Sequence, residues 1–175
     1  EARLPSLAVL PFVNLSGDPE QDYFADGMAM EIITALTRSS GLFVIARNSS
    51  FAYRDQEIDI RQVGRDLGAG YVLEGSVRRA GDRLRITGQL VDATPGAHLW
   101  ADRFEGDRTQ VFDLQDRVAA SVVAAIEPTL QAAEVERHQR SRPDRLDAYD
   151  HLLRAYAFEH EFTAESLVAA LDCTR

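Results

Sequence analysis

The sequence predicts an α/β fold with a mixed five-stranded sheet and flanking helices. Short apolar runs alternate with segments whose apolar residues recur every three or four positions, which indicates strand, helix, strand, helix. Three strand-like segments joined by glycine-containing turns follow, a pattern typical of an antiparallel meander. A long helical segment comes last. The predicted order is therefore β-α-β-α-β-β-β-α.

The N-terminal segment predicts a strand, a turn and a helix. Residues 7–12 (LAVLPF) form a short apolar run of the kind found in buried strands. After the turn, Phe24, Met28 and Leu36 share one face of a helix, because their spacing is a multiple of about four residues. Residues 39–41 (SSG) end that helix, since glycine and serine favour turns.

The next segments predict a crossover unit. Residues 42–46 (LFVIA) form a second apolar run, so strand, helix and strand follow one another as in a unit with parallel strands. Residues 47–59 are predicted to form a polar loop. A short helix is predicted over residues 60–67, and Gly68 ends it.

The meander occupies residues 71–104. The first strand, 71–79, is rich in β-branched and aromatic residues, and Gly81 follows it in a tight hairpin turn. The returning strand alternates apolar and polar side chains, as a half-buried strand does. Residues 94–96 (TPG) match a type II turn before the third strand begins.

A longer helix is predicted from about Thr109 through Leu130. Apolar side chains recur along it in steps of about four residues, which gives one narrow apolar stripe. Pro128 lies inside the pattern, and because proline removes a backbone donor we expect it to kink or split the helix near Glu127.

The sequence predicts three regions. Residues 1–137 are assigned to the α/β domain. Residues 138–145 are polar and rich in arginine, which predicts a linker. Residues 146–175 regain an apolar periodicity and predict a short helical hairpin that opens a further helical region.

Composition excludes several classes of protein. The net charge is −9, with 28 acidic residues and 19 arginines but no lysine, so non-specific binding to nucleic acid is not expected. A single cysteine, Cys173, excludes an internal disulfide and a cysteine-rich metal site. No apolar run approaches the roughly 20 residues of a membrane span, and no signal peptide pattern opens the sequence, so a cytoplasmic protein is expected.

No motif for catalysis or metal binding is complete. Residues 22–33 match a calcium loop at positions one, five and six, but Phe24 and Ile33 occupy positions that need oxygen ligands. His160 is followed by Glu161 as in zinc proteases, but the second histidine of that motif is missing. We therefore assign no catalytic residue, no metal ligand and no cofactor.

Two sets of residues are candidates for binding. The first lies where open α/β sheets bind ligands, beyond the carboxyl ends of parallel strands, and comprises Asn14, Ser16, Asp18, Asp22, Asp26, Arg47, Asn48 and Ser49. The second is the basic hairpin, whose arginines suit a phosphate or an acidic partner but also suit a solvated hairpin tip: Arg78, Arg79, Arg83 and Arg85.

Three longer stretches carry a family resemblance: LAVLPFVNLSGDPEQDYFADGM, LFVIARNSSFAY and VGRDLGAGYVLEGSVRRAGDRLRITGQLVDATPGAHLWADRF. Over about residues 4–130 they resemble the TolB N-terminal-like domain of bacterial signalling proteins named adenylate or guanylate cyclases. The resemblance implies a fold similar to the anticodon-binding domain of class II aminoacyl-tRNA synthetases. It also implies that residues 146–175 begin a tetratricopeptide array. It implies no catalytic residue.

Together these observations predict a non-catalytic regulatory or protein-interaction module. We expect it to lie between a cyclase or DNA-binding output domain and a tetratricopeptide array, with protein partners bound through the helical region. The alternative is a small-ligand-sensing domain whose pocket is formed by the loops 14–26 and 47–50. No nucleic-acid partner and no membrane segment are expected in these residues, and homo-oligomer formation stays open.

Overall fold

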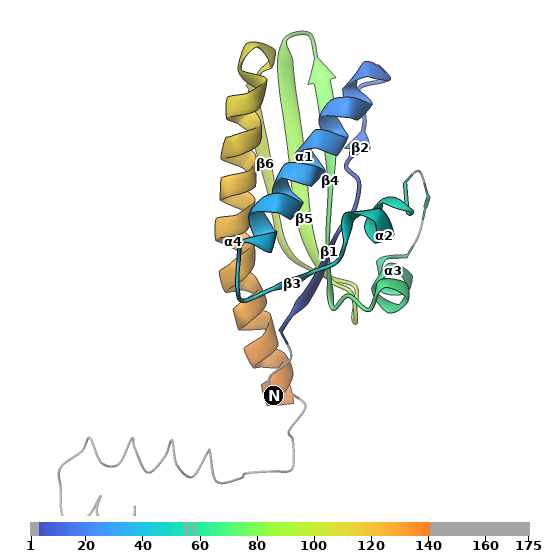
Figure 1. Cartoon of the computed structure of the whole chain (residues 1–175), viewed down its shortest axis with the longest axis vertical. Helices are drawn as coiled ribbons and strands as arrows, with labels where there is room; N and C mark the ends of the chain where they lie inside the picture. Colours follow the sequence, from blue (N-terminus) through green and yellow to red (C-terminus); the bar gives the residue numbers. More distant parts are fainter. Residues whose placement is uncertain (1–3, 55, 58, 141–175) are drawn as a thin grey trace, which may run out of the picture. The chain divides into compact units, whose positions relative to one another are not determined.

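The computed structural model describes residues 4–54, 56–57 and 59–140 (Figure 1). The chain divides into two compact units, Glu1–Glu134 and Val135–Arg175. The elements follow in this order: β1 (Ser6–Val9), β2 (Val13–Asn14), α1 (Glu20–Thr37), β3 (Phe43–Val44), α2 (Arg47–Phe51), α3 (Ile60–Leu67), β4 (Tyr71–Ala80), β5 (Arg83–Asp92), β6 (Ala97–Asp107), the 3-10 turn η1 (Arg108–Gln110) and α4 (Val111–Arg140).

The strands form one mixed sheet, which confirms the predicted fold class. Its order is β3-β1-β4-β5-β6, and the short strand β2 pairs with β4 beyond the end of β1. β1 pairs in parallel with β3 and with β4, and β2 is also parallel to β4. β4, β5 and β6 are antiparallel neighbours, as the predicted meander requires, and the 11-residue β6 forms an edge of the sheet. The sheet therefore has six strands, since β2 adds to the five predicted.

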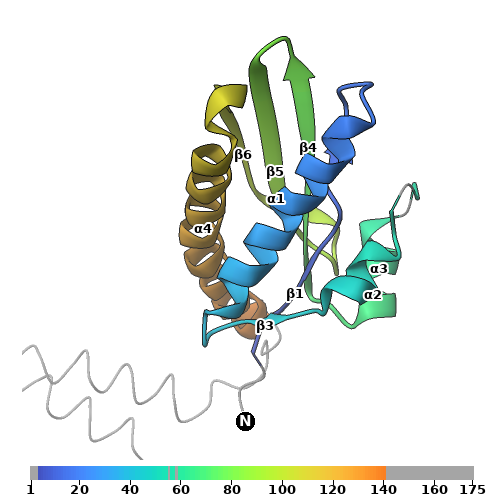
Figure 2. The same cartoon turned by 45° about the horizontal axis from the view of Figure 1, so that its top comes forward.

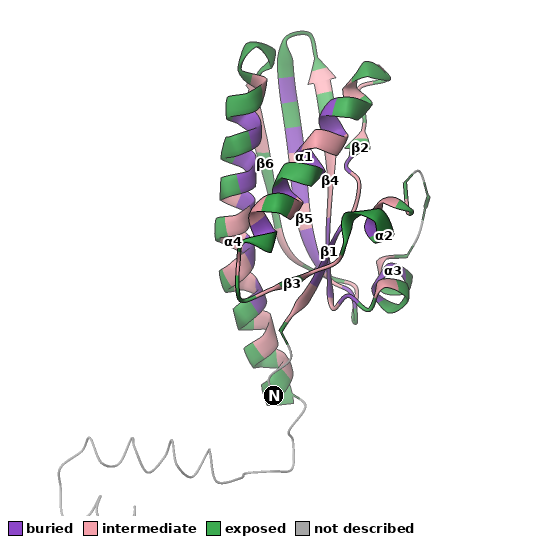
Figure 3. Ribbon diagram, in the orientation of Figure 1, coloured by how far each residue is buried: buried purple, intermediate pink, exposed green. Residues whose placement is uncertain are grey.

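A large hydrophobic core fills one face of the sheet, beneath α1 and α4 (Figure 3). Because side chains alternate along a strand, Tyr71, Leu73 and Val77 of β4 all lie on this face. The buried residues of α1 and α4 pack against them, and they include Phe24, Met28, Ile32, Leu36, Leu114, Val118, Val122, Ile126 and Leu130.

A much smaller apolar cluster lies on the opposite face, where α3 packs (Figure 2). Its buried members are small side chains: Ala8, Val63, Ala69, Val72 and Ala93. Gly64 lets α3 approach this closely, because a Cβ at that position would lie 2.5 Å from Cβ of Ala93.

Local sequence signals account for the ends of α3 and for the β4–β5 hairpin. The Asp59 side chain caps α3 by accepting a hydrogen bond from the backbone N of Arg61 at 2.9 Å. Gly68 ends the helix in the left-handed conformation at φ 64°, which glycine adopts without steric cost. Gly81 makes the hairpin turn in the same way at φ 60°.

The predicted loop over residues 47–59 is wrong at its start, because Arg47–Phe51 forms helix α2. The hydroxyl of Ser50, which is fully buried, donates a hydrogen bond to the backbone O of Arg47 at 3.2 Å. The Phe51 ring lies 5.0 Å from Cζ of Arg47 and 5.6 Å from Cζ of Arg54. These contacts stabilise a helical turn whose sequence, RNSSF, has no strong intrinsic preference for helix.

Helix α4 continues from Val111 to Arg140 with Pro128 inside it, so the predicted split near Glu127 does not occur. Residues 138–140 of the predicted linker are the last residues of this helix, whereas 141–145 and the predicted hairpin over 146–175 lie outside the described residues. In the described part of the chain, Arg108–Arg140 is the one helical stretch long and apolar enough to span a membrane. The buried residues of this helix, among them Leu114, Val118 and Ile126, pack in the large core.

Candidate functional site

An open cavity of about 710 Å³ lies where the pairing along β4 changes from β1 to β2. Four parts of the chain bound it: residues 10–15 including β2, one side of α1, the segment from Tyr53 to the middle of α3, and strands β4 and β5. Its walls combine apolar side chains with carboxylates and amides. The cavity thus lies next to the predicted ligand site beyond the carboxyl end of β1.

Carboxylates dominate the charged groups of the cavity wall. Asp22, Asp26, Glu57 and Glu74 line it, whereas Arg54 is the one cationic side chain in the described lining. With all five groups ionised the lining carries a net charge of −3. This arrangement favours a positively charged occupant over an anion.

Asn14 holds Asp22 at one end of the cavity. Its amide Nδ2 donates to Oδ1 of Asp22 at 2.7 Å and to the backbone O of Asp18 at 2.8 Å. Its Oδ1 accepts from the backbone N of Ser16 at 2.9 Å. The Asn14 side chain therefore fixes the turn into α1 and the position of a cavity carboxylate together.

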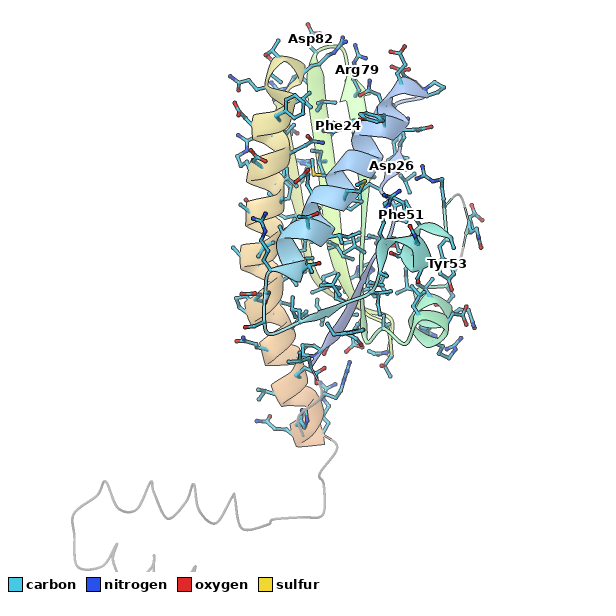
Figure 4. All side chains as sticks on the ribbon, viewed as in Figure 1. Phe24, Asp26, Phe51, Tyr53, Arg79 and Asp82 are labelled. Atoms are coloured by element: carbon cyan, nitrogen blue, oxygen red, sulfur yellow. The ribbon has the colours of Figure 1, made fainter. Side chains whose placement is uncertain are left out.

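Asp26 projects from α1 toward the α2–α3 segment, on the side where Phe51 and Tyr53 are labelled (Figure 4). Its Oδ2 forms an ion pair with Nη2 of Arg54 at 2.6 Å. Its Oδ1 is buried and has no hydrogen-bond partner within the described residues. A buried acceptor without a donor is costly, and the surrounding chain shields this oxygen from solvent.

Strands β4 and β5 supply a polar ladder on the α3 face of the sheet. Glu74 is directly opposite Gln89, and Ser76 is directly opposite Thr87. The side-chain amide of Gln89 donates to Oε1 of Glu74, which leaves the second oxygen of that carboxylate for other donors. All four side chains line the cavity.

Tyr53 orients the far wall. Its hydroxyl donates to Oδ2 of Asp66 at 3.2 Å. The pKa of Tyr53 is raised above its ordinary value. Desolvation is the largest cause, followed by the negative charge of Asp66 and by this hydrogen bond. The hydroxyl therefore stays protonated and keeps α3 tied to the segment that carries Arg54.

The structure brings three of the eight predicted loop residues to the cavity: Asn14, Asp22 and Asp26. Ser16 and Asp18 instead contact β4, because Ser16 Oγ accepts from the backbone N of Arg79 at 2.8 Å and Asp18 Oδ2 lies 3.4 Å from Arg79 Nη1. The other three belong to α2, are exposed and are not among the lining residues: Arg47, Asn48 and Ser49. The second wall is formed instead by the start of α3 and by Tyr53, Arg54, Gln56 and Glu57.

The basic hairpin is largely paired within the chain. Glu105 of β6 lies 3.1 Å from Arg83 and 2.9 Å from Arg85, measured between carboxylate oxygen and guanidinium nitrogen. The pKa of Glu105 is lowered below its ordinary value, mainly by Arg85 and to a smaller extent by Arg83 and Arg103. Arg79 pairs with Asp18, and Arg78 is exposed. The arrangement is that of a charged, solvated hairpin whose arginines are partly neutralised.

Sequence reasoning missed the part of the cavity formed by β4, β5 and the α2–α3 segment. One signal was present, because Glu74 and Ser76 alternate with apolar residues in β4 just as Thr87 and Gln89 do in β5. No signal marked Arg54, since its partner lies 28 residues away. In the described part of the chain, no three histidine, cysteine or carboxylate side chains are grouped closely enough to hold a metal ion.

Comparisons of the sequence with known proteins give two matches. A family model described as HilA/YgeH-like transcriptional regulator, second domain, matches residues 2–121. The protein named Putative adenylate cyclase 3 from Rhizobium meliloti (strain 1021) is 52% identical over 166 residues. That match covers 95% of this chain but only 28% of the relative, so the chain corresponds to a minor part of it.

The solved structures that resemble this chain are distant from it in sequence. Lipoprotein GNA1162 from Neisseria meningitidis superposes with a TM-score of 0.51 at 17% identity, over 70% of this chain and 98% of that chain. TolB from Acinetobacter baumannii matches with a TM-score of 0.48 at 19% identity, over 70% of this chain and 29% of that chain. At such identities the first likeness shows the fold alone.

Proposed function

Because this chain belongs to the family of the HilA/YgeH-like transcriptional regulator second domain, we propose that it is a non-catalytic regulatory module of a bacterial signalling protein. The observation that carries the proposal is the recurrence of one domain in two kinds of protein. The family is described as part of a transcriptional regulator, whereas the 52% identical relative is named an adenylate cyclase. A domain common to two different outputs is better explained as a regulator of output than as either output itself.

The finer architecture is proposed in the same way. A TolB-like α/β domain would lie between an output domain and a tetratricopeptide array, and the array would bind protein partners. The 166-residue match to the cyclase-named relative supports a shared architecture, because it is longer than the family match and must extend beyond residue 121. The negative net charge supports protein partners over nucleic acid, and a cytoplasmic location is part of the proposal.

Two assays test the proposed function. The purified chain, incubated with ATP and Mn²⁺, is expected to form no cyclic AMP, and its formation above a heat-denatured control would overturn the non-catalytic assignment. In the whole parent protein, deletion of residues 1–137 is expected to leave the basal activity of the output domain and to abolish its modulation. Loss of that basal activity, with the output domain still folded by circular dichroism, would contradict a regulatory role.

A ligand-sensing function is the second candidate, and the cavity between α1, the α2–α3 segment and β4 favours it. In that case the occupant of the cavity would be the signal that the module transmits. An open hollow with apolar walls and a few fixed polar groups is the usual form of a small-molecule site.

A further inference from the structure

The acceptors of the cavity outnumber its donors. Asn14 donates to one oxygen of Asp22, Gln89 donates to one oxygen of Glu74, and Arg54 pairs with one oxygen of Asp26. Asp22 and Glu74 each keep a second oxygen, whereas the second oxygen of Asp26 has no partner among the described residues and is shielded from solvent by the surrounding chain. An occupant that satisfies these oxygens must bring N–H donors and positive charge.

The spacing of the carboxylates argues against an inorganic ion. They lie on three different parts of the chain, namely α1, the α2–α3 segment and β4, and among the described residues they form no group that could hold a metal. Apolar side chains also line the cavity, among them Leu10, Phe12 and Ile60. Acceptors on separate parts of the chain, in a lining that is partly apolar, match cationic groups joined by methylene groups.

From this arrangement we infer that the cavity binds a small organic cation whose amino or guanidino groups are separated by a methylene chain, as in linear polyamines and agmatine. The apolar walls contact the methylene chain, and the carboxylates of Asp22 and Glu74 accept from its ends. Asp26 accepts through Oδ2 once Arg54 is displaced from that oxygen. This inference rests on the ligand-sensing form of the proposed function and names the chemical class of the signal.

Arg54 acts as an internal competitor in this scheme. Its guanidinium occupies Oδ2 of Asp26, and 40% of its side chain is exposed, so it has room to move away when a cation arrives. The Phe51 ring, 5.6 Å from Cζ of Arg54, supports the guanidinium beside the cavity. Replacement of Arg54 by a neutral residue therefore removes a competitor and makes the lining more negative.

Isothermal titration calorimetry of the whole 175-residue chain in 150 mM NaCl tests the inference, with spermidine, putrescine and agmatine as probes and MgCl₂ as the inorganic control. Saturable one-site binding of at least one organic probe is expected. Asp26→Asn is expected to weaken it about tenfold or more, because a charge-assisted hydrogen bond is lost. Glu74→Gln is expected to act in the same direction, and Arg54→Gln is expected to tighten binding.

The matched control is Asp116→Asn, which removes the same charge from an exposed position of α4 outside the lining. The affinity of this variant for the organic probes is expected to stay within about twofold of the affinity of the unmodified chain, since salt screens distant surface charges. If none of the three organic probes gives a binding signal with a folded chain, the inference is overturned. Equal weakening of probe binding by Asp26→Asn and by Asp116→Asn would also overturn it. Binding of Mg²⁺ that the same variants weaken or tighten in the same way would also overturn the inference. None of these outcomes bears on the cyclic AMP and deletion assays, so the proposed regulatory function stands or falls separately.

Discussion

The two faces of the sheet are covered in different ways. Beneath α1 and α4 lies a continuous core with large side chains such as Tyr71, Met28 and Ile126, all fully buried. On the other face α3 covers a cluster of small side chains, and beyond it the strands turn polar at Glu74 and Gln89. The contrast indicates that the face under α1 and α4 supplies most of the stability of the fold. The face under α3 keeps the cavity and the carboxylates that a binding function needs.

We call the face under α1 and α4 the thick face and the face under α3 the thin face. The largest expected effect comes from a substitution in the core of the thick face. Ile126→Ala removes a fully buried side chain from the large core and is expected to lower the free energy of unfolding by about 2–5 kcal/mol. Val63→Ala, on the thin face, is expected to cost only about 1–2 kcal/mol because fewer buried carbons are lost. Urea unfolding of both variants measures the difference. Equal losses would contradict the comparison.

A second experiment examines the thick face at one pair of glycines. Gly75 and Gly88 are directly opposite each other on β4 and β5. A Cβ at Gly75 would lie 2.6 Å from the Phe12 ring and from the backbone O of Thr87, whereas a Cβ at Gly88 would meet Trp100 at an ordinary 3.4 Å. Gly75→Ala is therefore expected to cost about 1–3 kcal/mol of unfolding free energy.

Gly88→Ala is the matched control for Gly75→Ala, and its midpoint of urea unfolding is expected to change little. If the two variants lose the same stability, close packing of Phe12 on β4 is not the reason that position 75 is glycine. A lower midpoint for Gly88→Ala than for Gly75→Ala would place the tight packing on β5 instead.

A smaller effect is expected from the cap of α3 on the thin face. Asp59→Ala removes the side chain that accepts from the backbone N of Arg61, which is expected to cost about 1 kcal/mol. Because α3 rests on a small cluster, the loss is expected as faster amide hydrogen exchange in residues 60–67 rather than as global unfolding. Unchanged exchange in α3, with faster exchange in α1, would show that the thin face is not the weaker one.

The smallest effect concerns the charged outer part of the thin face. The pKa of Glu105 is lowered in the folded state by Arg85, Arg83 and Arg103, so its contribution to stability is present above the pKa of the unfolded chain, near pH 4. That contribution is lost as the pH falls through the lower folded pKa. The melting temperature of the unmodified chain is therefore expected to exceed that of Glu105→Gln at pH 7, and the gap is expected to narrow toward pH 3.

Differential scanning calorimetry at pH 7, 5, 4 and 3 measures this gap. Asp116→Asn serves again as the control, since Asp116 is exposed on α4 and is not the ion-pair partner of Arg79, Arg83 or Arg85. A gap that stays constant down to pH 3 would show that the arginines around Glu105 do not stabilise its ionised form.

The sequence predicted the elements whose signals are local. The Asp59 cap and Gly68 mark the two ends of α3, and Gly81 marks the hairpin, so these boundaries follow from a few neighbouring residues. Strand β2 was not predicted, because two residues become a strand only through pairing with Ser76 and Val77 of β4. Helix α2 was missed for a similar reason, since contacts of its side chains offset its weak helix preference.

The same distinction applies to the candidate site. Asn14, Asp22 and Asp26 could be predicted because they follow the first strand closely in sequence. Arg54, Glu74 and Gln89 could not be assigned to the same cavity. The parallel pairing of β4 brings Glu74 there, its antiparallel pairing with β5 brings Gln89, and the ion pair across 28 residues brings Arg54. Their polarity was visible in the sequence, but their proximity depends on the tertiary fold.

Strand β6 has a consequence for solubility. As an 11-residue edge strand it offers a long row of backbone groups to which a strand of another copy could add. Asp102, Arg103, Glu105 and Asp107 place charges along that row, and charged side chains make such edge-to-edge stacking unfavourable. The charges on β6 therefore make the addition of a strand from another copy at this edge unfavourable, which disfavours fibril-like growth.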